Sequence, residues 1–260
     1  MIRSAVAAIV LACVAAVAQG EERPIAPADL ATGTTFAAPA IQAMQADDAA
    51  NPAFLWVERG ERLWQAPAGA DARSCAACHG AAATTMRGVA ARYPAVDAAS
   101  GTLFDVEARI NDCRTRRQRA APFARESEEL LALTAYVALQ SRGMPFAVSV
   151  DGAARPAFER ARAFYHERHG QMNLSCAQCH EQNWGRRLFA EKISQGHGTA
   201  FPAYRLEWQS MGSLDRRLRA CLNGIRAEMP AAGAPETIGL ALFLAWRAEG
   251  LKLEAPGVRR

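Results

Sequence analysis

Apolar residues recur at helical spacing in four windows of the chain. Two windows, 57–64 and 155–168, combine apolar positions with arginine and glutamate, whereas 130–143 and 237–250 are apolar at most positions and end in glycine. Apolar positions three and four residues apart predict helices that bury one face, and a glycine after the last periodic residue marks a helix end. Strand-like alternation is scarce, so the pattern predicts an all-α protein.

The predicted helices fall into two similar halves. Each half begins with a polar helix and ends with an apolar one. Shorter matches support the same division: an aromatic-Pro-Ala triplet occurs at 93–95 and again at 201–203, and single cysteines occur at Cys113 and Cys221. We therefore expect two tandem helical lobes that are related by internal duplication.

The start of the chain, at 1–20, has the features of a secretory signal. Arg3 provides the positive start, residues 5–17 are apolar, and residues 18–20 form a small-residue exit. Cleavage there removes residues 1–20, which include Cys13. No later stretch is long enough to span a bilayer, so we expect a soluble periplasmic protein without a membrane span.

Composition also divides the mature chain. Residues 21–50 are rich in alanine and proline and lack periodicity, so we expect an extended N-terminal arm that wraps the lobes or contacts a partner. Turn-forming residues interrupt the helical pattern at 143–156, which we interpret as a linker. The two lobes are then expected to cover residues 51–150 and 151–260.

Charge argues against one class of partner. The chain has 30 lysines and arginines against 26 acidic residues, a formal net charge of +4. The arginines are dispersed, and such a small excess does not indicate binding to nucleic acid.

Each lobe contains one Cys-x-x-Cys-His sequence, at 75–79 and at 176–180. In this motif the two thiols bind haem covalently and the histidine coordinates the iron. A zinc site shares the Cys-x-x-Cys spacing but needs a second ligand pair, and none follows at a suitable distance. We therefore predict two small cytochrome c-like lobes with two covalently bound haems c. The residues that attach the haems or ligate the irons are Cys75, Cys78 and His79 in the first lobe, and Cys176, Cys179 and His180 in the second.

Two cysteines remain outside the haem motifs of the mature chain. Cys113 follows His79, and Cys221 follows His180, at similar separations along the sequence. A disulfide between them is one interpretation, since the periplasm is oxidising. A symmetric pair is better explained by a role within each lobe, namely thiolate ligation of the iron. We predict Cys113 as the distal ligand of the first haem and Cys221 as that of the second.

Methionine and histidine are the alternative distal ligands. Met86 lies too close to His79 to reach the far side of a haem, and the other methionines have no counterparts between the halves. His197 is the best histidine alternative for the second haem, and His166 and His169 are weaker. Thiolate ligation lowers a haem's reduction potential and methionine raises it, so cysteine ligands favour sulfur chemistry over simple electron transfer.

Arg217 precedes Cys221 by four residues, so the two side chains share one face of a helix. A planar guanidinium beside a reactive sulfur is suited to an oxyanion such as thiosulfate. Arg109 precedes Cys113 by the same distance, so a haem-propionate partner common to both lobes is an equal alternative. The basic strip at 114–119 is expected to be solvated or to face a partner.

These residues together resemble the SoxA family, the dihaem subunit of the SoxAX cytochromes of bacterial thiosulfate oxidation. The resemblance covers nearly the whole mature chain. It depends most on FPAYRLEW at 201–208 and RRLRACL at 216–222, with further matches at 110–113 and in both haem motifs.

The resemblance implies an L-cysteine S-thiosulfotransferase. In this family thiosulfate is coupled oxidatively to a cysteine of the carrier SoxYZ, giving a cysteine S-thiosulfonate and two electrons. It implies that the second haem, ligated by His180 and Cys221, is catalytic, that Cys221 carries a persulfide or thiosulfonate, and that Arg217 binds the substrate. The first haem, ligated by His79 and Cys113, is then distant and not essential. Electrons leave through a separate monohaem subunit, SoxX, to a soluble cytochrome c.

Two other functions stay open from the sequence. A thiosulfate dehydrogenase that forms tetrathionate also uses a His/Cys haem, but it needs no carrier protein. A non-catalytic dihaem electron-transfer cytochrome c would have Met/His ligation as its mark.

Overall fold

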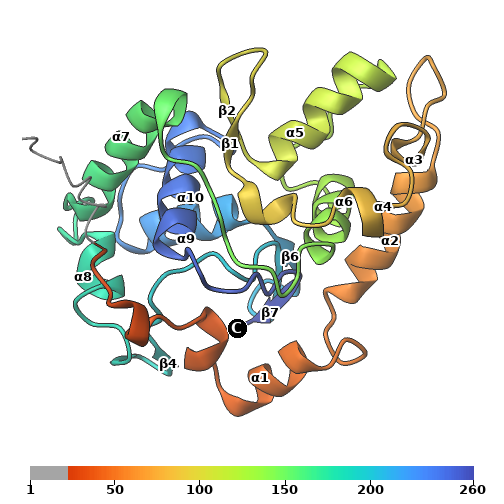
Figure 1. The fold of residues 1–260 in the computed structure, drawn as a ribbon. Coiled ribbons are helices and arrows are strands. Elements are labelled where there is room, and N and C mark those ends of the chain that lie inside the picture. Colours follow the sequence, from red (N-terminus) through yellow and green to blue (C-terminus); the bar gives the residue numbers. More distant parts are fainter. Residues whose placement is uncertain (1–22) are drawn as a thin grey trace, which may run out of the picture.

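The protein is mostly helical, and its helices form two groups that lie side by side (Figure 1). The computed structural model describes residues 23–260, and the predicted signal at 1–20 lies outside this range. The first group comprises α2 (Phe54–Gln65), α3 (Cys75–His79), α4 (Ala82–Thr85), α5 (Val106–Cys113) and α6 (Glu128–Leu139). The second comprises α7 (Arg155–His166), α8 (Cys176–His180), α9 (Leu214–Gly224) and α10 (Pro235–Arg247). All four predicted helices are confirmed, with ends that differ by a few residues.

The apolar helices α6 and α10 form the base of each group. They are buried along most of their length and pack against the polar helices α2 and α7, respectively. The buried face of α2 is the stripe Val57, Gly60 and Trp64, whose three- and four-residue spacing follows the helix period. A side chain at Gly60 would overlap the carbonyl oxygen of Ala132, so glycine allows α2 and α6 to approach closely.

A short hairpin precedes the cysteine-bearing helix in each group. The hairpins are β1 (Ala95–Val96) with β2 (Leu103–Phe104), and β5 (Ala203–Arg205) with β6 (Ser210–Gly212). Both are antiparallel, and each residue pair in the first corresponds to a pair in the second at one constant offset, which aligns Ala95 with Ala203 and Phe104 with Gly212. The helices that follow, α5 and α9, therefore start at equivalent places.

The prediction of an all-α protein is incorrect in this respect. Strand β7 (Gly257–Arg259) adds parallel to β5, and β3 (Arg187–Leu188) pairs with β4 (Glu191–Lys192) in the segment after α8. Each strand is two or three residues long, which is too short for apolar alternation to appear in the sequence. The protein is thus a mostly helical fold with small sheets.

The N-terminal arm contacts the second group and is not extended throughout. It contains short 3-10 turns and the helix α1 (Pro39–Ala46). Gln45 at the end of α1 accepts hydrogen bonds from the backbone of Val258 at 3.0 Å and from Arg259 at 2.8 Å. The side chain of Gln195 bonds the arm's backbone at Ala31. The arm therefore lies along β7 and the loop that follows β4.

The predicted linker at 143–156 contains no α-helix before α7, and it is well packed. Phe146 is buried, and its backbone N–H donates to Leu251 at 3.1 Å. Gly143 donates likewise to Leu253 at 2.8 Å. The linker thus runs beside the segment that follows α10. Within residues 23–260, no helix combines the length and apolar character needed to cross a bilayer.

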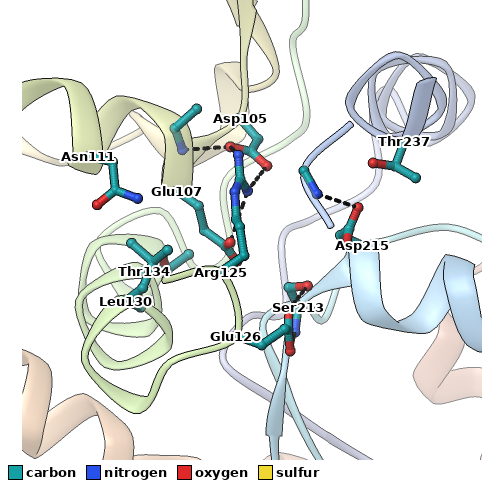
Figure 2. Close-up of polar contacts among 12 residues, drawn as sticks. Asp105, Glu107, Asn111, Arg125, Glu126, Leu130, Thr134, Ser213, Asp215 and Thr237 are labelled. Atoms are coloured by element: carbon teal, nitrogen blue, oxygen red, sulfur yellow. Dashed lines mark hydrogen bonds and ion pairs between the residues drawn. The ribbon is translucent and has the colours of Figure 1, made fainter. Parts of the chain in front are cut away.

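Arg125 pairs with two carboxylates where the two helical groups meet (Figure 2). Arg125 donates to both oxygens of Asp105, at 2.6 and 3.0 Å, and to Glu107 at 2.9 Å. Its neighbour Glu126 accepts a hydrogen bond from the hydroxyl of Ser213, the first residue before α9. Burial, together with the charge of Asp105, raises the pKa of the Glu107 carboxyl. These contacts fix the start of α5 relative to the start of α9.

Replacement of Glu107 with glutamine should change how thermal stability depends on pH. The folded protein keeps the Glu107 proton at pH values where the unfolded chain, whose carboxyl has an ordinary pKa of 4.5, has released it. The stability from this group is therefore full below the unfolded pKa and declines as the pH rises. Between pH 5 and 8 the Tm of the wild type should fall relative to that of Glu107→Gln by about 3 °C or more in calorimetry. Glu128→Gln, at an exposed position of α6, is the control, and parallel pH profiles of wild type and Glu107→Gln would contradict the prediction.

Candidate functional site

Both Cys-x-x-Cys-His sequences form a single helical turn that a serine caps. Ser74 accepts a hydrogen bond from the backbone N–H of Ala77 at 3.0 Å, and Ser175 accepts one from Gln178 at 3.2 Å. In α8 the Gln178 side chain also accepts from the Ser175 backbone, which completes a capping box. The local sequence thus sets the turn, and the two thiols of each motif, three residues apart, share one face of it.

The other two cysteines lie near the haem motif of their own group. Burial and the nearby Cys113 raise the pKa of the Cys75 thiol, and Cys78 contributes to the raised pKa of Cys113. Burial and the nearby Cys221 likewise raise the pKa of both thiols of the second motif. None of the six cysteines in residues 23–260 is in a disulfide. The disulfide between Cys113 and Cys221, which the sequence left open, is therefore not formed.

His180 is oriented as a metal ligand would be. Its Nδ1 donates to the carbonyl oxygen of Ser194 at 2.7 Å, which leaves the Nε2 lone pair available. Burial lowers the pKa of His180 to about 4, so the ring is neutral at neutral pH, as a ligand must be. Gly196, with φ of 76°, approaches the ring so closely that a Cβ there would lie 2.8 Å from the His180 Cγ. The backbone at 194–196 thus holds the imidazole in place.

The alternative histidine ligands make other contacts. His197 is buried, and its Nε2 lies 3.2 Å from the amide oxygen of Gln195. His169 Nε2 lies 2.8 Å from a backbone carbonyl oxygen of α7, and His166 is exposed at the end of that helix. The donor groups of each half therefore fit a c-type haem best as paired thiols, a histidine and a nearby third thiol.

Arg217 contacts the sulfur of Cys221 directly. Its Nη1 donates to the Cys221 Sγ at 2.9 Å across one turn of α9. The hydroxyl of Ser213 caps this helix by accepting from the Arg216 backbone at 3.0 Å, and Glu126 holds the same hydroxyl. A cation at this distance stabilises negative charge on the sulfur. The pairing predicted from the four-residue spacing is therefore present.

Arg109, at the equivalent position of α5, has a different environment. It donates to Asp97 at 2.7 Å, to the Tyr93 hydroxyl at 3.1 Å and to Asp112 at 3.2 Å. The bond from Arg109 and those from Ser100 lower the pKa of Asp97 to about 2, so this carboxylate is ionised at neutral pH. Arg109 is thus a neutralised structural residue.

None of the three partners of Arg109 has the same residue at the equivalent position of the second half. At the offset that the hairpins define, Tyr93, Asp97 and Asp112 correspond to Phe201, Arg205 and Ala220. Phe201 lacks a hydroxyl, Ala220 lacks a carboxylate, and Arg205 reverses the charge. Among residues 23–260, Arg217 consequently has no carboxylate partner, and its side chain is hydrogen-bonded only to Cys221. The two arginines therefore have different hydrogen-bond partners although their spacing to cysteine is the same.

The fold and the Cys-x-x-Cys-His turns define a cytochrome c with covalently bound haem. Residues 59–146 match the family model described as SoxA/TsdA, cytochrome c domain. The chain is 38% identical over 230 residues to the L-cysteine S-thiosulfotransferase subunit SoxA of Pseudaminobacter salicylatoxidans, across 88% of this chain and 80% of that protein. It is 36% identical over 228 residues to the same subunit of Paracoccus pantotrophus, across 88% and 78%. This chain belongs to the SoxA family.

A solved structure agrees with this assignment. The crystal structure of SoxXA from P. pantotrophus matches with a TM-score of 0.85 and 35% sequence identity, and the match covers 89% of this chain and 87% of that one. The similarity therefore includes both helical groups, whereas the family model covers the first group and part of the linker.

Substitution of the two arginines should separate their roles. Arg109→Gln should lower the Tm by a few degrees, because it leaves the buried Asp97 without its cation. Arg217→Gln should change the Tm little, because no carboxylate depends on it. Thermal unfolding of both variants, each with its haem content confirmed by absorbance, gives the comparison. Equal losses of Tm would show that Arg217 is structural as well.

Proposed function

We propose that this chain is the catalytic subunit of a SoxAX-type L-cysteine S-thiosulfotransferase. It couples thiosulfate to a cysteine thiol of the carrier SoxYZ, forms the cysteine S-thiosulfonate and passes two electrons to a cytochrome c. The names of the relatives that cover most of the chain support this reaction. The observation that carries the proposal is the contact of the Arg217 guanidinium with Cys221, since no carboxylate of residues 23–260 pairs with this arginine.

The proposed site holds two covalently bound haems c. Cys75 and Cys78 attach the first, with His79 and Cys113 as its iron ligands, and Cys176 and Cys179 attach the second, with His180 and Cys221. When bound, the second haem supplies an electron acceptor beside the reacting sulfur. The free Nε2 of His180 and the proximity of Cys221 to both thiols of its motif support this ligand set.

The reaction then proceeds through Cys221. Arg217 holds the sulfonate oxygens of thiosulfate by charge-assisted hydrogen bonds, which directs the terminal sulfur toward the Cys221 Sγ. The Cys221 thiolate and thiosulfate would form an S–S bond, and the two electrons released would pass to the bound haems and onward to the cytochrome c acceptor. The carrier thiolate then attacks the sulfur bonded to the sulfonate group. This step transfers the S-thiosulfonate to the carrier, with the Cys221 thiolate as the leaving group.

The proposed partners follow from the same reaction. A SoxX-type monohaem cytochrome c forms a heterodimer with this chain and takes the electrons onward to a soluble cytochrome c, which the similarity to a SoxXA structure supports. The proposed location is the periplasm, which the predicted signal at 1–20 supports. We further propose that the lobes at 51–150 and 151–260 arose by duplication, which the shared hairpin register and helix order support.

Removal of the Cys221 sulfur should abolish the transfer reaction. Cys221→Ala should lower the rate of thiosulfate coupling to SoxYZ by at least about 1000-fold, because the bond-forming sulfur is lost. Mass spectrometry of the carrier and reduction of cytochrome c measure this rate. The matched control is Cys113→Ala at the equivalent position, which should retain most of the activity. Retained activity in Cys221→Ala, or tetrathionate formation by the wild type without a carrier, would contradict the proposal.

Removal of one haem motif should leave the other haem attached. Cys75→Ser/Cys78→Ser should hold one haem by intact mass and keep most of the transfer activity, since the chemistry is assigned to the second lobe. Cys176→Ser/Cys179→Ser should also hold one haem and lose activity. Low-temperature spin resonance of each ferric protein should show a low-spin thiolate signal, and its absence would exclude cysteine ligation.

A further inference from the structure

Arg205 occupies the position that Asp97 has in the first half. It is the last residue of β5 and pairs with Ser210, as Asp97 does with Thr102 at the end of the first hairpin. The turn that joins the two strands also differs between the hairpins. Ser100 donates two hydrogen bonds to Asp97, at 2.9 and 2.8 Å. Its counterpart Trp208 instead packs its ring against the Arg205 guanidinium at 4.9 Å. The second hairpin is therefore adapted to a cation at this position.

The Arg205 side chain is buried and incompletely paired. The residue is 9% exposed, and its Nη2 donates to Glu207 at 3.0 Å. Its Nε is buried and has no hydrogen-bond partner in the described part of the chain. A buried donor without a partner is costly, and this one belongs to a charged group. The Arg205 guanidinium therefore has one N–H group, at Nε, that is available to a ligand.

The shared hairpin register places Arg205 beside Arg217. In the first half, the residue at this hairpin position reaches the α5 arginine at 2.7 Å. In the second half the same register puts Arg205 at the position that faces Arg217, the arginine bonded to Cys221. Burial and the charge of Arg217 both lower the pKa of Arg205, whereas Glu207 and, to a lesser extent, Cys221 raise it. Glu207 is the one carboxylate that pairs with Arg205 within residues 23–260, and its side chain is 54% exposed. The pair thus retains excess positive charge.

We propose that Arg205 is a second anion-binding residue, which together with Arg217 binds a small divalent oxyanion next to Cys221. The identity of that anion as thiosulfate depends on the proposed function. Two guanidiniums match the charge of the dianion, and the unused Nε supplies a donor for one of its oxygens. Glu207 competes with the anion for Arg205.

The test is titration calorimetry of the oxidised holoprotein with thiosulfate and, as an unreactive dianion, with sulfate. Arg205→Gln should weaken binding of both by about 10- to 100-fold, the effect of losing one charge-assisted hydrogen bond. In the transfer assay the same variant should raise the KM for thiosulfate more than it lowers kcat. Glu207→Gln should tighten binding by about two- to fivefold, an increase that a purely structural role would not produce.

Arg216→Gln is the matched control, because Arg216 packs against the same Trp208 ring at 4.2 Å and carries the same charge. It should change binding by less than about threefold. Unchanged affinity in Arg205→Gln, or equal losses in both arginine variants, overturns the proposal. If Arg205→Gln does not retain haem and cannot be titrated, Glu207→Gln provides the test. An unchanged affinity of Glu207→Gln for the dianions then overturns the proposal. A different outcome is that the wild type transfers no thiosulfate but Arg205→Gln still binds dianions more weakly than the wild type. This outcome would support the anion site and reject the proposed function.

Discussion

In each half of the molecule, a residue at the end of the first strand of a short hairpin occupies the position that faces an arginine, and this arginine lies one helical turn before a cysteine outside the haem motif. The position of this arginine depends on the hairpin register, on the side-chain cap of the following helix and on the packing of that helix against its group. In the first half the facing residue is Asp97, and the contact is an ion pair. In the second half it is Arg205, and the guanidinium of Arg217 turns to Cys221. The same hairpin position therefore holds an anion in the first half and a cation in the second.

The remainder of the fold keeps this contact in place. The buried helices α6 and α10 each provide a rigid base for one group. Arg125 and Glu126 join the groups, because one binds the carboxylates at the start of α5 and the other binds the cap of α9. On the opposite side of the second site, the backbone at 194–196 holds the ring of His180. Neither cysteine helix can shift without breaking several polar contacts at its start.

Local signals in the sequence predict a large part of this arrangement. The four long helices follow from apolar periodicity, and the haem motifs and the spacing of Arg217 to Cys221 can be read directly. Strands of two or three residues leave no periodic signal, and the helix α1 lies in an Ala/Pro-rich segment without one. The position of Arg205 depends on the pairing of β5 with β6, which makes residue 205 equivalent to Asp97 of the first half. A comparison of the halves beyond the aromatic-Pro-Ala triplets would have aligned Arg205 with Asp97.

The two halves illustrate how a site differs from its structural counterpart. The first half satisfies Arg109 with three oxygen partners, the arrangement that stability alone favours. The second half has none of these three at the equivalent positions, and Arg205 stands where the first half has the counterion Asp97. Such a local violation of electrostatic pairing is unfavourable unless a ligand compensates it, and violations of this kind concentrate at functional sites. The same reasoning explains why equal spacing of arginine to cysteine in the two halves is not informative by itself. The hydrogen-bond partners of each arginine distinguish the two sites, because Arg109 pairs with Asp97 and Asp112 whereas Arg217 contacts the sulfur of Cys221.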